Sequence, residues 1–195
     1  MKKYINKNCV DLVINCSAMT DTTICEEEPD GCYMINSLPN LVLCYLTAKL
    51  VYISTDHVFD GKKGLYTEEC FVNPQGVYAK SKVMGEWFTS SKPNNLIIRT
   101  SFMENFKLDQ AFTDKFGSWL WVEDCAAQIS KAVKLNLSGL YHIGGVRKSV
   151  YDFVSERYDV KPTTLSKNPI SRCGLPYLVD TSLYIKKWQD ANRPN

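Results

Sequence analysis

Four short runs of apolar and β-branched residues most constrain how this chain of 195 residues can fold. The runs occupy residues 10–16, 50–55, 96–100 and 140–143. Their apolar residues follow one another instead of alternating with polar ones, which is typical of strands buried on both faces of a sheet. Such strands occur mainly in parallel sheets whose two faces are covered by helices.

Segments with helical character separate these runs. Residues 31–46 form the first segment, and Pro39 limits its regular part. Residues 78–90 form the second, and residues 122–135 form the third, which opens with the acidic pair that a helix N-terminus favours. The alternation of strand and helix predicts an α/β fold with a parallel sheet, in which ligands bind beyond the carboxyl ends of the strands.

Polar residues follow each predicted strand, at residues 15–18, 54–57, 99–102 and 144–145. Because the carboxyl ends of parallel strands meet at one edge of a sheet, we expect these loops to line one crevice. The chain from residue 148 onward is less regular and contains several prolines, so we expect it to cap the same end.

The charge balance excludes some classes of partner. Lys and Arg number 23 against 21 Asp and Glu, which leaves a net charge of +2. This balance gives no electrostatic reason to expect nucleic acid or an anionic membrane as the main partner. The longest apolar runs, such as residues 41–46, are far shorter than the roughly 20 residues that span a bilayer.

Cysteine usage indicates the compartment. Eight cysteines are scattered through the chain without CxxC spacing, and residues 1–8 lack the apolar core of a leader peptide. We therefore expect a cytoplasmic protein whose thiols are reduced and mostly fill the core. With only His57 and His142 available and no paired spacing, we expect no metal site.

Tyr78 and Lys82 form the pair with the clearest chemical potential. They lie four residues apart at the start of a predicted helix, so both side chains can share one face. The ammonium favours the phenolate, and we expect it to lower the pKa of Tyr78 and make this residue a general acid toward a carbonyl oxygen. The hydroxyls of Ser54 and Thr55 can hydrogen-bond that oxygen, and the hydride of a carbonyl reduction must come from a nicotinamide cofactor.

Spacing alone is weak support, because Tyr45 and Lys49 have the same separation. This second pair runs directly into a strand and has no polar loop beside it. We interpret it as a packing tyrosine and a lysine at a helix end.

Five blocks in order carry a resemblance to a known family: residues 11–18, 26–29, 54–61 (STDHVFDG), 73–82 (NPQGVYAKSK) with Gly85 and Glu86, and 99–101. The chain resembles dTDP-4-dehydrorhamnose reductase and its relatives among the extended short-chain dehydrogenase/reductases. Fainter similarity continues through residues 116–117, 139–142 and 151–152, so it covers most of the chain.

The resemblance implies a fold, an activity and a cofactor. The implied fold is a partial Rossmann-like doubly wound sheet, with a truncated catalytic domain at residues 1–147 and a reduced substrate-binding cap at residues 148–195. The implied activity is reduction of the 4-keto group of a nucleotide-linked deoxysugar, with hydride from NADPH or NADH and a proton from Tyr78. In this scheme Lys82 tunes Tyr78 and holds the ribose, and Thr55 binds the carbonyl oxygen.

The resemblance also implies which residues form the site. Thr55, Tyr78 and Lys82 match the catalytic positions, and Asn36 matches a supporting asparagine. The cofactor is expected along Cys16, Ser17, Ala18, Ser54, Tyr78 and Lys82. The sugar pocket is expected at Thr55, Asp56, Val58, Phe59 and Phe102. Relatives commonly carry Trp at the Phe102 position, a departure that bears on the pocket's shape.

Several of these residues have a structural interpretation as well. Thr55 can end a strand and cap a turn, and Asn15 and Asp56 can satisfy loop backbone groups. Arg99 is interpreted as a structural ion-pair residue and His142 as a hydrogen-bonded core residue. Residues 26–28 are interpreted as the solvated start of a helix.

The Gly-rich turn that receives the pyrophosphate in this family is absent from the sequence. The resemblance begins at the family's fourth strand, as if roughly 50 to 60 residues, about two βα units, were missing. We therefore expect residues 10–16 to form a strand at the edge of the sheet. The chain is then a fragment, or it pairs with another chain in a homo- or hetero-oligomer, or it is a degenerate relative in which other residues cover this edge. The alternative function is a non-catalytic binding or regulatory protein on the same scaffold.

Overall fold

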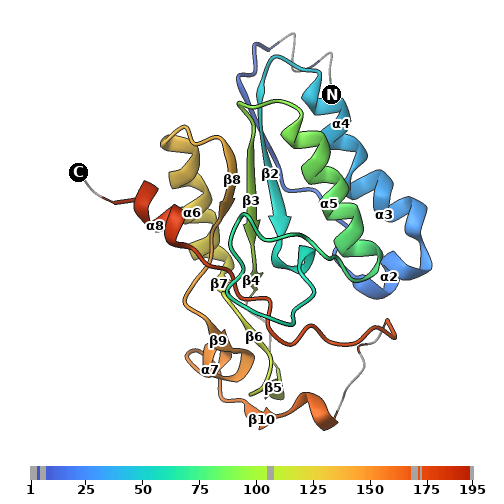
Figure 1. Ribbon diagram of the computed structural model, residues 1–195, viewed down its shortest axis with the longest axis vertical. Helices are drawn as coiled ribbons and strands as arrows, with labels where there is room; N and C mark the ends of the chain where they lie inside the picture. The colour runs from blue at the N-terminus through green and yellow to red at the C-terminus, as the bar shows by residue number, and fades with distance from the viewer. Residues whose placement is uncertain (1–3, 5–7, 105–107, 168–170, 172, 194–195) are drawn as a thin grey trace.

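A four-stranded parallel sheet forms the centre of the computed structural model, which describes residues 4, 8–104, 108–167, 171 and 173–193. Most of the N-terminal segment considered above, residues 1–8, lies outside the described residues. The strands run in the order β1-β2-β3-β8 (Figure 1), with the bounds Leu12–Asn15, Lys49–Thr55, Leu96–Thr100 and Gly139–His142. Each falls on a predicted run, so the α/β fold with a parallel sheet is confirmed.

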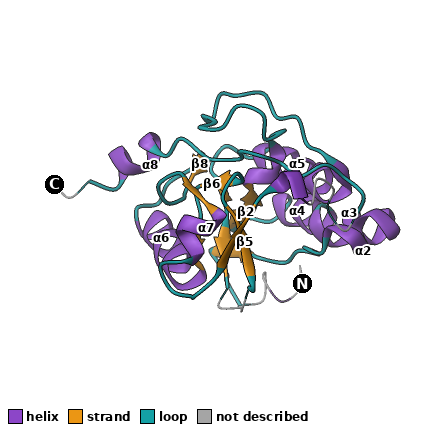
Figure 2. Ribbon diagram, turned by 90° about the horizontal axis from the view of Figure 1, so that it is seen from below, coloured by secondary structure: helices purple, strands orange, loops and turns teal. Residues whose placement is uncertain are grey.

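Helices cover both faces of this sheet (Figures 1 and 2). One layer holds α2 to α5, with the bounds Thr22–Glu27, Pro29–Asn36, Leu38–Cys44 and Gly76–Ser90. On the other face, α6 (Val122–Lys134) and α8 (Lys186–Ala191) contribute Ala132 and Trp188 to a cluster with the buried strand residues Val51, Leu96 and Ile98. Burial on both sides explains why apolar residues are consecutive in the strands.

The predicted helix at residues 31–46 is two helices, because α3 ends at Asn36 and α4 begins at Leu38. Pro39 lies in the first turn of α4, where the N–H that proline lacks would have no intrahelical partner. The predicted helix at residues 78–90 begins earlier, at Gly76.

Strand β1 lies at the edge of the sheet and, among the described residues, pairs with β2 alone. Its Ile14 side chain is 42% exposed. The predicted position of this strand at an edge therefore agrees with the sheet order.

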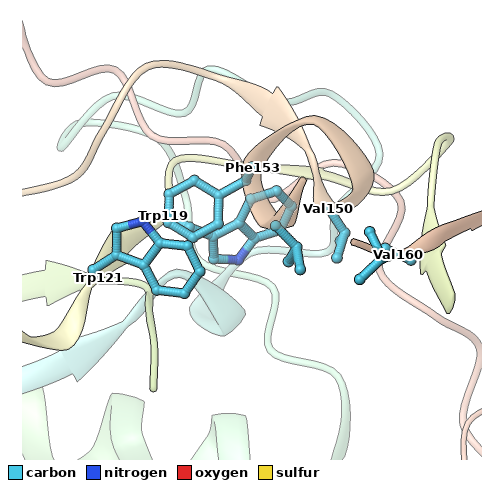
Figure 3. Packing of buried hydrophobic residues seen from close by; sticks show 7 residues of the cluster. Trp119, Trp121, Val150, Phe153 and Val160 are labelled. Carbon is cyan, nitrogen blue, oxygen red and sulfur yellow. The ribbon is translucent and has the colours of Figure 1, made fainter. Parts of the chain in front are cut away.

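Short strand pairs and a small helix lie beyond the carboxyl end of the sheet. The pairs are β4 (Phe102–Met103) with β7 (Leu120–Trp121), β5 (Gln110–Phe112) with β10 (Lys161–Thr163), and β6 (Phe116–Gly117) with β9 (Lys148–Ser149). Helix α7 (Val150–Val154) adds Phe153, which stacks on Trp121 at a centroid distance of 4.5 Å (Figure 3). Two of the pairs join segments from both sides of residue 148, and the division into domains at that residue stays a prediction.

Two further properties concern the described part of the chain. No helix there is both long and apolar enough to cross a bilayer, and no group of three His, Cys, Asp or Glu side chains is placed to hold a metal ion. Cys25, Cys32 and Cys125 are buried, whereas Cys9 and Cys16 are exposed.

A buried ion pair joins α5 to the sheet. The Arg99 guanidinium on β3 donates to both Glu86 carboxylate oxygens, at 2.9 and 2.7 Å, and both side chains are buried. The Ser54 hydroxyl at the end of β2 also donates to Glu86. The interpretation of Arg99 as an ion-pair residue is confirmed, and the pair fixes α5 one turn beyond Lys82.

We expect Arg99→Leu to lower the free energy of unfolding by about 3–5 kcal/mol, because it leaves the Glu86 carboxylate buried without its counter-charge. Urea denaturation at neutral pH measures the loss. The double variant Glu86→Leu with Arg99→Leu removes both charges, and we expect it to be more stable than Arg99→Leu alone. A single variant as stable as the wild type would contradict this account of α5.

Candidate active site

The carboxyl ends of β1, β2 and β3 open into a cavity of about 430 Å³. Eight residues predicted for the site line it: Cys16, Ala18, Ser54, Thr55, Asp56, Tyr78, Lys82 and Phe102. They come from the loop after β1, the end of β2 and the residue that follows it, the start of β4, and the first two turns of α5. The structure thus brings together residues that lie up to 86 positions apart (102 − 16) in the sequence.

The start of α5 positions Tyr78. Gly76 adopts a positive φ of 81°, and a side chain there would meet Leu175 at 2.5 Å and Glu26 at 2.7 Å. The Val77 N–H donates to the Glu26 carboxylate at 2.6 Å, so Glu26 from α2 occupies the N-terminus of α5. The interpretation of residue 26 as part of a solvated helix start is wrong, because its carboxylate caps a different helix.

Lys82 is buried beneath the cavity. Its ammonium donates to the Ile53 carbonyl at 2.7 Å and lies 4.4 Å from the centroid of the Tyr52 ring. Burial lowers the pKa of Lys82 to about 8, against the opposing effect of the Glu86 carboxylate. The group is therefore mostly charged at neutral pH. Within the described part of the chain it makes this one hydrogen bond, so two N–H donors remain for a ligand.

Tyr78 has a raised pKa, not the lowered value expected from the sequence. Burial raises the pKa of its phenol to about 12, and a hydrogen bond with Thr55 opposes that rise. The expectation is wrong because Lys82 directs its ammonium to Ile53 and Tyr52, which leaves desolvation as the dominant effect. Tyr78 is consequently protonated throughout the neutral range and can donate a proton.

Thr55 and Asp56 line the cavity and also hydrogen-bond neighbouring groups. The Thr55 hydroxyl accepts from the His57 N–H at 3.2 Å and donates to the Asp56 carboxylate at 3.2 Å. Asp56 is buried and also accepts from the Thr181 hydroxyl, which ties the C-terminal segment to the site. Thr55 therefore caps a turn and lines the cavity at the same time.

Four predicted site residues lie elsewhere. Val58 and Phe59 are fully buried in a cluster with Tyr66 and Leu183 and do not line the cavity, because the short 3-10 helix at Asp56–Val58 turns them into the core. The Ser17 hydroxyl donates to the Asn15 side chain at 2.7 Å and is not part of the cavity lining.

Asn36, the fourth of these residues, is buried and joins the loop after β1 to α5. Its side-chain oxygen accepts from the Met19 N–H at 2.7 Å, and its amide donates to Ser81 at 2.9 Å. This arrangement suits the supporting role implied for it.

Other structural interpretations can be compared with the contacts. The Asn15 side chain accepts from the Ser17 N–H, which satisfies a loop backbone group. His142 is fully buried, and its Nδ1 lies 3.0 Å from the Tyr66 carbonyl, so its interpretation as a hydrogen-bonded core residue is confirmed. The Tyr45 side chain is 79% exposed and does not pack, which overturns its interpretation as a packing tyrosine.

A second cavity of about 140 Å³ shares part of its lining with the larger one. Thr22, His57 and Tyr78 line both cavities. Burial lowers the pKa of His57, so its imidazole is neutral at neutral pH. Tyr78 therefore contributes to the lining of both cavities.

Sequence reasoning missed most of the second cavity. Lys115 and a wall formed by Ser171, Cys173 and residues 175–178 belong to it, and no motif marks them. Thr20 and Thr22 of the larger cavity were also missed, although they follow the loop predicted to run along a cofactor.

Comparison with known proteins agrees with the resemblance. The chain is 32% identical over 155 residues to the spore coat polysaccharide biosynthesis protein SpsK of Bacillus subtilis, covering 68% of this chain and 54% of that protein. It is 35% identical over 99 residues to dTDP-4-dehydrorhamnose reductase of Sinorhizobium fredii, covering 48% of this chain and 33% of that one. The chain thus spans about half the length, or less, of these curated relatives.

A solved structure shows the same fold across nearly the whole chain. A hypothetical dTDP-4-dehydrorhamnose reductase from Sulfolobus tokodaii superposes with a TM-score of 0.83 at 28% identity, covering 97% of this chain and 76% of that one. The family model described as RmlD substrate binding domain matches residues 1–105. Because this match covers more than half of the sequence, the chain belongs to the RmlD substrate-binding-domain family.

Proposed function

We propose that the protein is a nicotinamide-dependent oxidoreductase that reduces the 4-keto group of a nucleotide-linked deoxysugar. One observation carries the proposal: the protonated Tyr78 lines two cavities, and Lys82 and Thr55 line the larger one with it. The named reductases among its relatives support the reaction class.

The larger cavity fits the nicotinamide riboside end of NADPH or NADH. Small residues, Cys16 and Ala18, line one side of it, and Lys82 has N–H donors left for ribose hydroxyls. No Gly-rich turn that could cradle a pyrophosphate occurs in the part of the chain that the structure describes. The described residues therefore fit the riboside end of the cofactor. When bound, the cofactor supplies the hydride.

The chain's own residues provide the proton and the charge. Tyr78 donates its phenolic proton to the carbonyl oxygen of the substrate, and the Thr55 hydroxyl can donate to the same oxygen once it turns away from the Asp56 carboxylate. Lys82 holds its ammonium on the Ile53 carbonyl and keeps N–H donors for the cofactor's ribose hydroxyls. Asp56, held by Thr181, keeps Thr55 in place.

Tyr78→Phe removes the proton donor and leaves the cavity's shape nearly unchanged. We expect carbonyl reduction to fall by about 10²–10⁴-fold, the usual contribution of a positioned acid. Tryptophan fluorescence during NADPH titration should show nearly the same cofactor affinity as in the wild type. Equal reduction rates in the two proteins would contradict the role of Tyr78.

The pH dependence of kcat/KM provides a separate prediction. The pKa of Lys82 is lowered to about 8, so its ammonium is present below that pH and is lost above it. Tyr78, with a pKa raised to about 12, keeps its proton over the same range. We therefore expect the rate of reduction to fall as the pH rises through about 8.

Lys82→Arg serves as the matched control, because a guanidinium stays charged across this range. We expect the decline near pH 8 to disappear in Lys82→Arg, whatever its absolute rate. A decline that persists in this variant would assign the inflection to another group.

A second candidate is a non-catalytic binding or regulatory protein. The chain is 35% identical over 79 residues to methionine adenosyltransferase 2 subunit beta of Rattus norvegicus, whose name is that of a subunit. The exposed edge of β1, including Ile14, would suit a partner chain or a further segment that adds a strand. If millimolar NADPH or NADH changes neither the tryptophan fluorescence nor the melting temperature, this candidate is favoured over a reductase that acts alone.

A further inference from the structure

Lys115 faces the second cavity from the loop between β5 and β6. It lines this cavity together with Tyr78 and His57. Its backbone is held in place, because its carbonyl accepts from the Val150 N–H at 2.9 Å. The side chain is half-buried, so the protein keeps a cation in the wall of a cavity that the proton donor Tyr78 also lines.

The Lys115 ammonium is poorly compensated. Among the described residues it forms no hydrogen bond or ion pair, and its nitrogen lies 5.3 Å from the centroid of the Tyr177 ring. The Asp56 carboxylate raises the pKa of Lys115, but the opposing effect of burial is larger and the net pKa is lowered. The free ammonium therefore has three N–H donors without an acceptor from the described chain.

Two nearby carboxylates accept hydrogen bonds from groups other than Lys115. Glu26 accepts the Val77 N–H at the start of α5, and Asp56 accepts the hydroxyls of Thr55 and Thr181. A half-buried cation without a hydrogen-bonded partner is well suited to an anionic oxygen, because the two groups form a charge-assisted hydrogen bond.

The second cavity adjoins a further one. A third cavity of about 390 Å³ shares Gln75 and residues 175–178 with the second cavity. The second cavity, at about 140 Å³, is small beside typical ligand sites of about 300–1,000 Å³. A ligand can therefore place one small ring beside Tyr78 and extend a larger group along this groove.

We infer that Lys115 is a specificity-determining residue that binds an anionic oxygen of the substrate in the cavity beside Tyr78. The oxygen belongs to a phosphoryl group of a nucleotide-linked sugar or to a carboxylate on the sugar. The inference rests on the proposed function in using the same cavity, and it adds the residue that contacts the negative charge of the substrate.

Binding measurements on the full chain test this inference without any turnover. Isothermal titration with dTDP, thymidine, D-glucuronate and D-glucose is compared for the wild type, Lys115→Gln and Lys115→Arg. We expect Lys115→Gln to weaken the binding of one charged probe, dTDP or D-glucuronate, by at least about tenfold, because the variant loses a charge-assisted hydrogen bond. Lys115→Arg should retain most of that affinity, and the uncharged probes should be unaffected.

Lys131→Gln is the matched control, since it removes one positive charge from an exposed position on α6. We expect it to bind every probe as the wild type does, and each variant's melting temperature verifies that it is folded. Weaker dTDP binding identifies a phosphoryl group, and weaker D-glucuronate binding identifies a carboxylate.

Two results would overturn the inference: Lys115→Gln binding both charged probes as the wild type does, or the wild type binding neither. Failure of the proposed function gives a different pattern, because charge-dependent binding at Lys115 would persist without any reduction of a keto sugar. Conversely, if the wild type reduces a keto sugar and Lys115→Gln binds both charged probes unchanged, the role of Lys115 is rejected and the proposed function is not.

Discussion

Close packing of α5 against the sheet is the constraint on which the rest of the site depends. A side chain at Gly85 would lie 2.5 Å from the Tyr52 hydroxyl and 2.7 Å from the Asn40 amide, so the helix approaches β2 and α4 as closely as glycine allows. The next residue, Glu86, forms the buried ion pair with Arg99. Together these contacts set the depth at which Tyr78 and Lys82 enter the cavity.

That depth also determines the protonation of both residues. Removal from water disfavours a phenolate and an ammonium alike, so burial moves the pKa of Tyr78 up and that of Lys82 down. Tyr78 is thereby kept as an acid, and Lys82 stays charged at neutral pH with donors left for a ligand. One physical cause, desolvation by the packed helix, accounts for both properties.

The sequence allowed the sheet to be predicted well, because strands buried on both faces require consecutive apolar residues. It also placed Thr55, Tyr78 and Lys82 together, since each follows directly from the end of a strand or the start of a helix. It did not allow the pKa of Tyr78 to be predicted, because that depends on the direction of the Lys82 ammonium. Lys115 was missed because its cavity is built from segments far apart in the chain.

Direct titration of Tyr78 tests the central claim that burial holds this residue in its acid form. NMR of protein labelled at the tyrosine ring, with Tyr78→Phe to assign the signal, follows the phenol as the pH rises. We expect the Tyr78 signal to remain unchanged through pH values at which free tyrosine ionises, about 10, because its pKa is raised to about 12. Ionisation of Tyr78 near neutral pH would contradict the account.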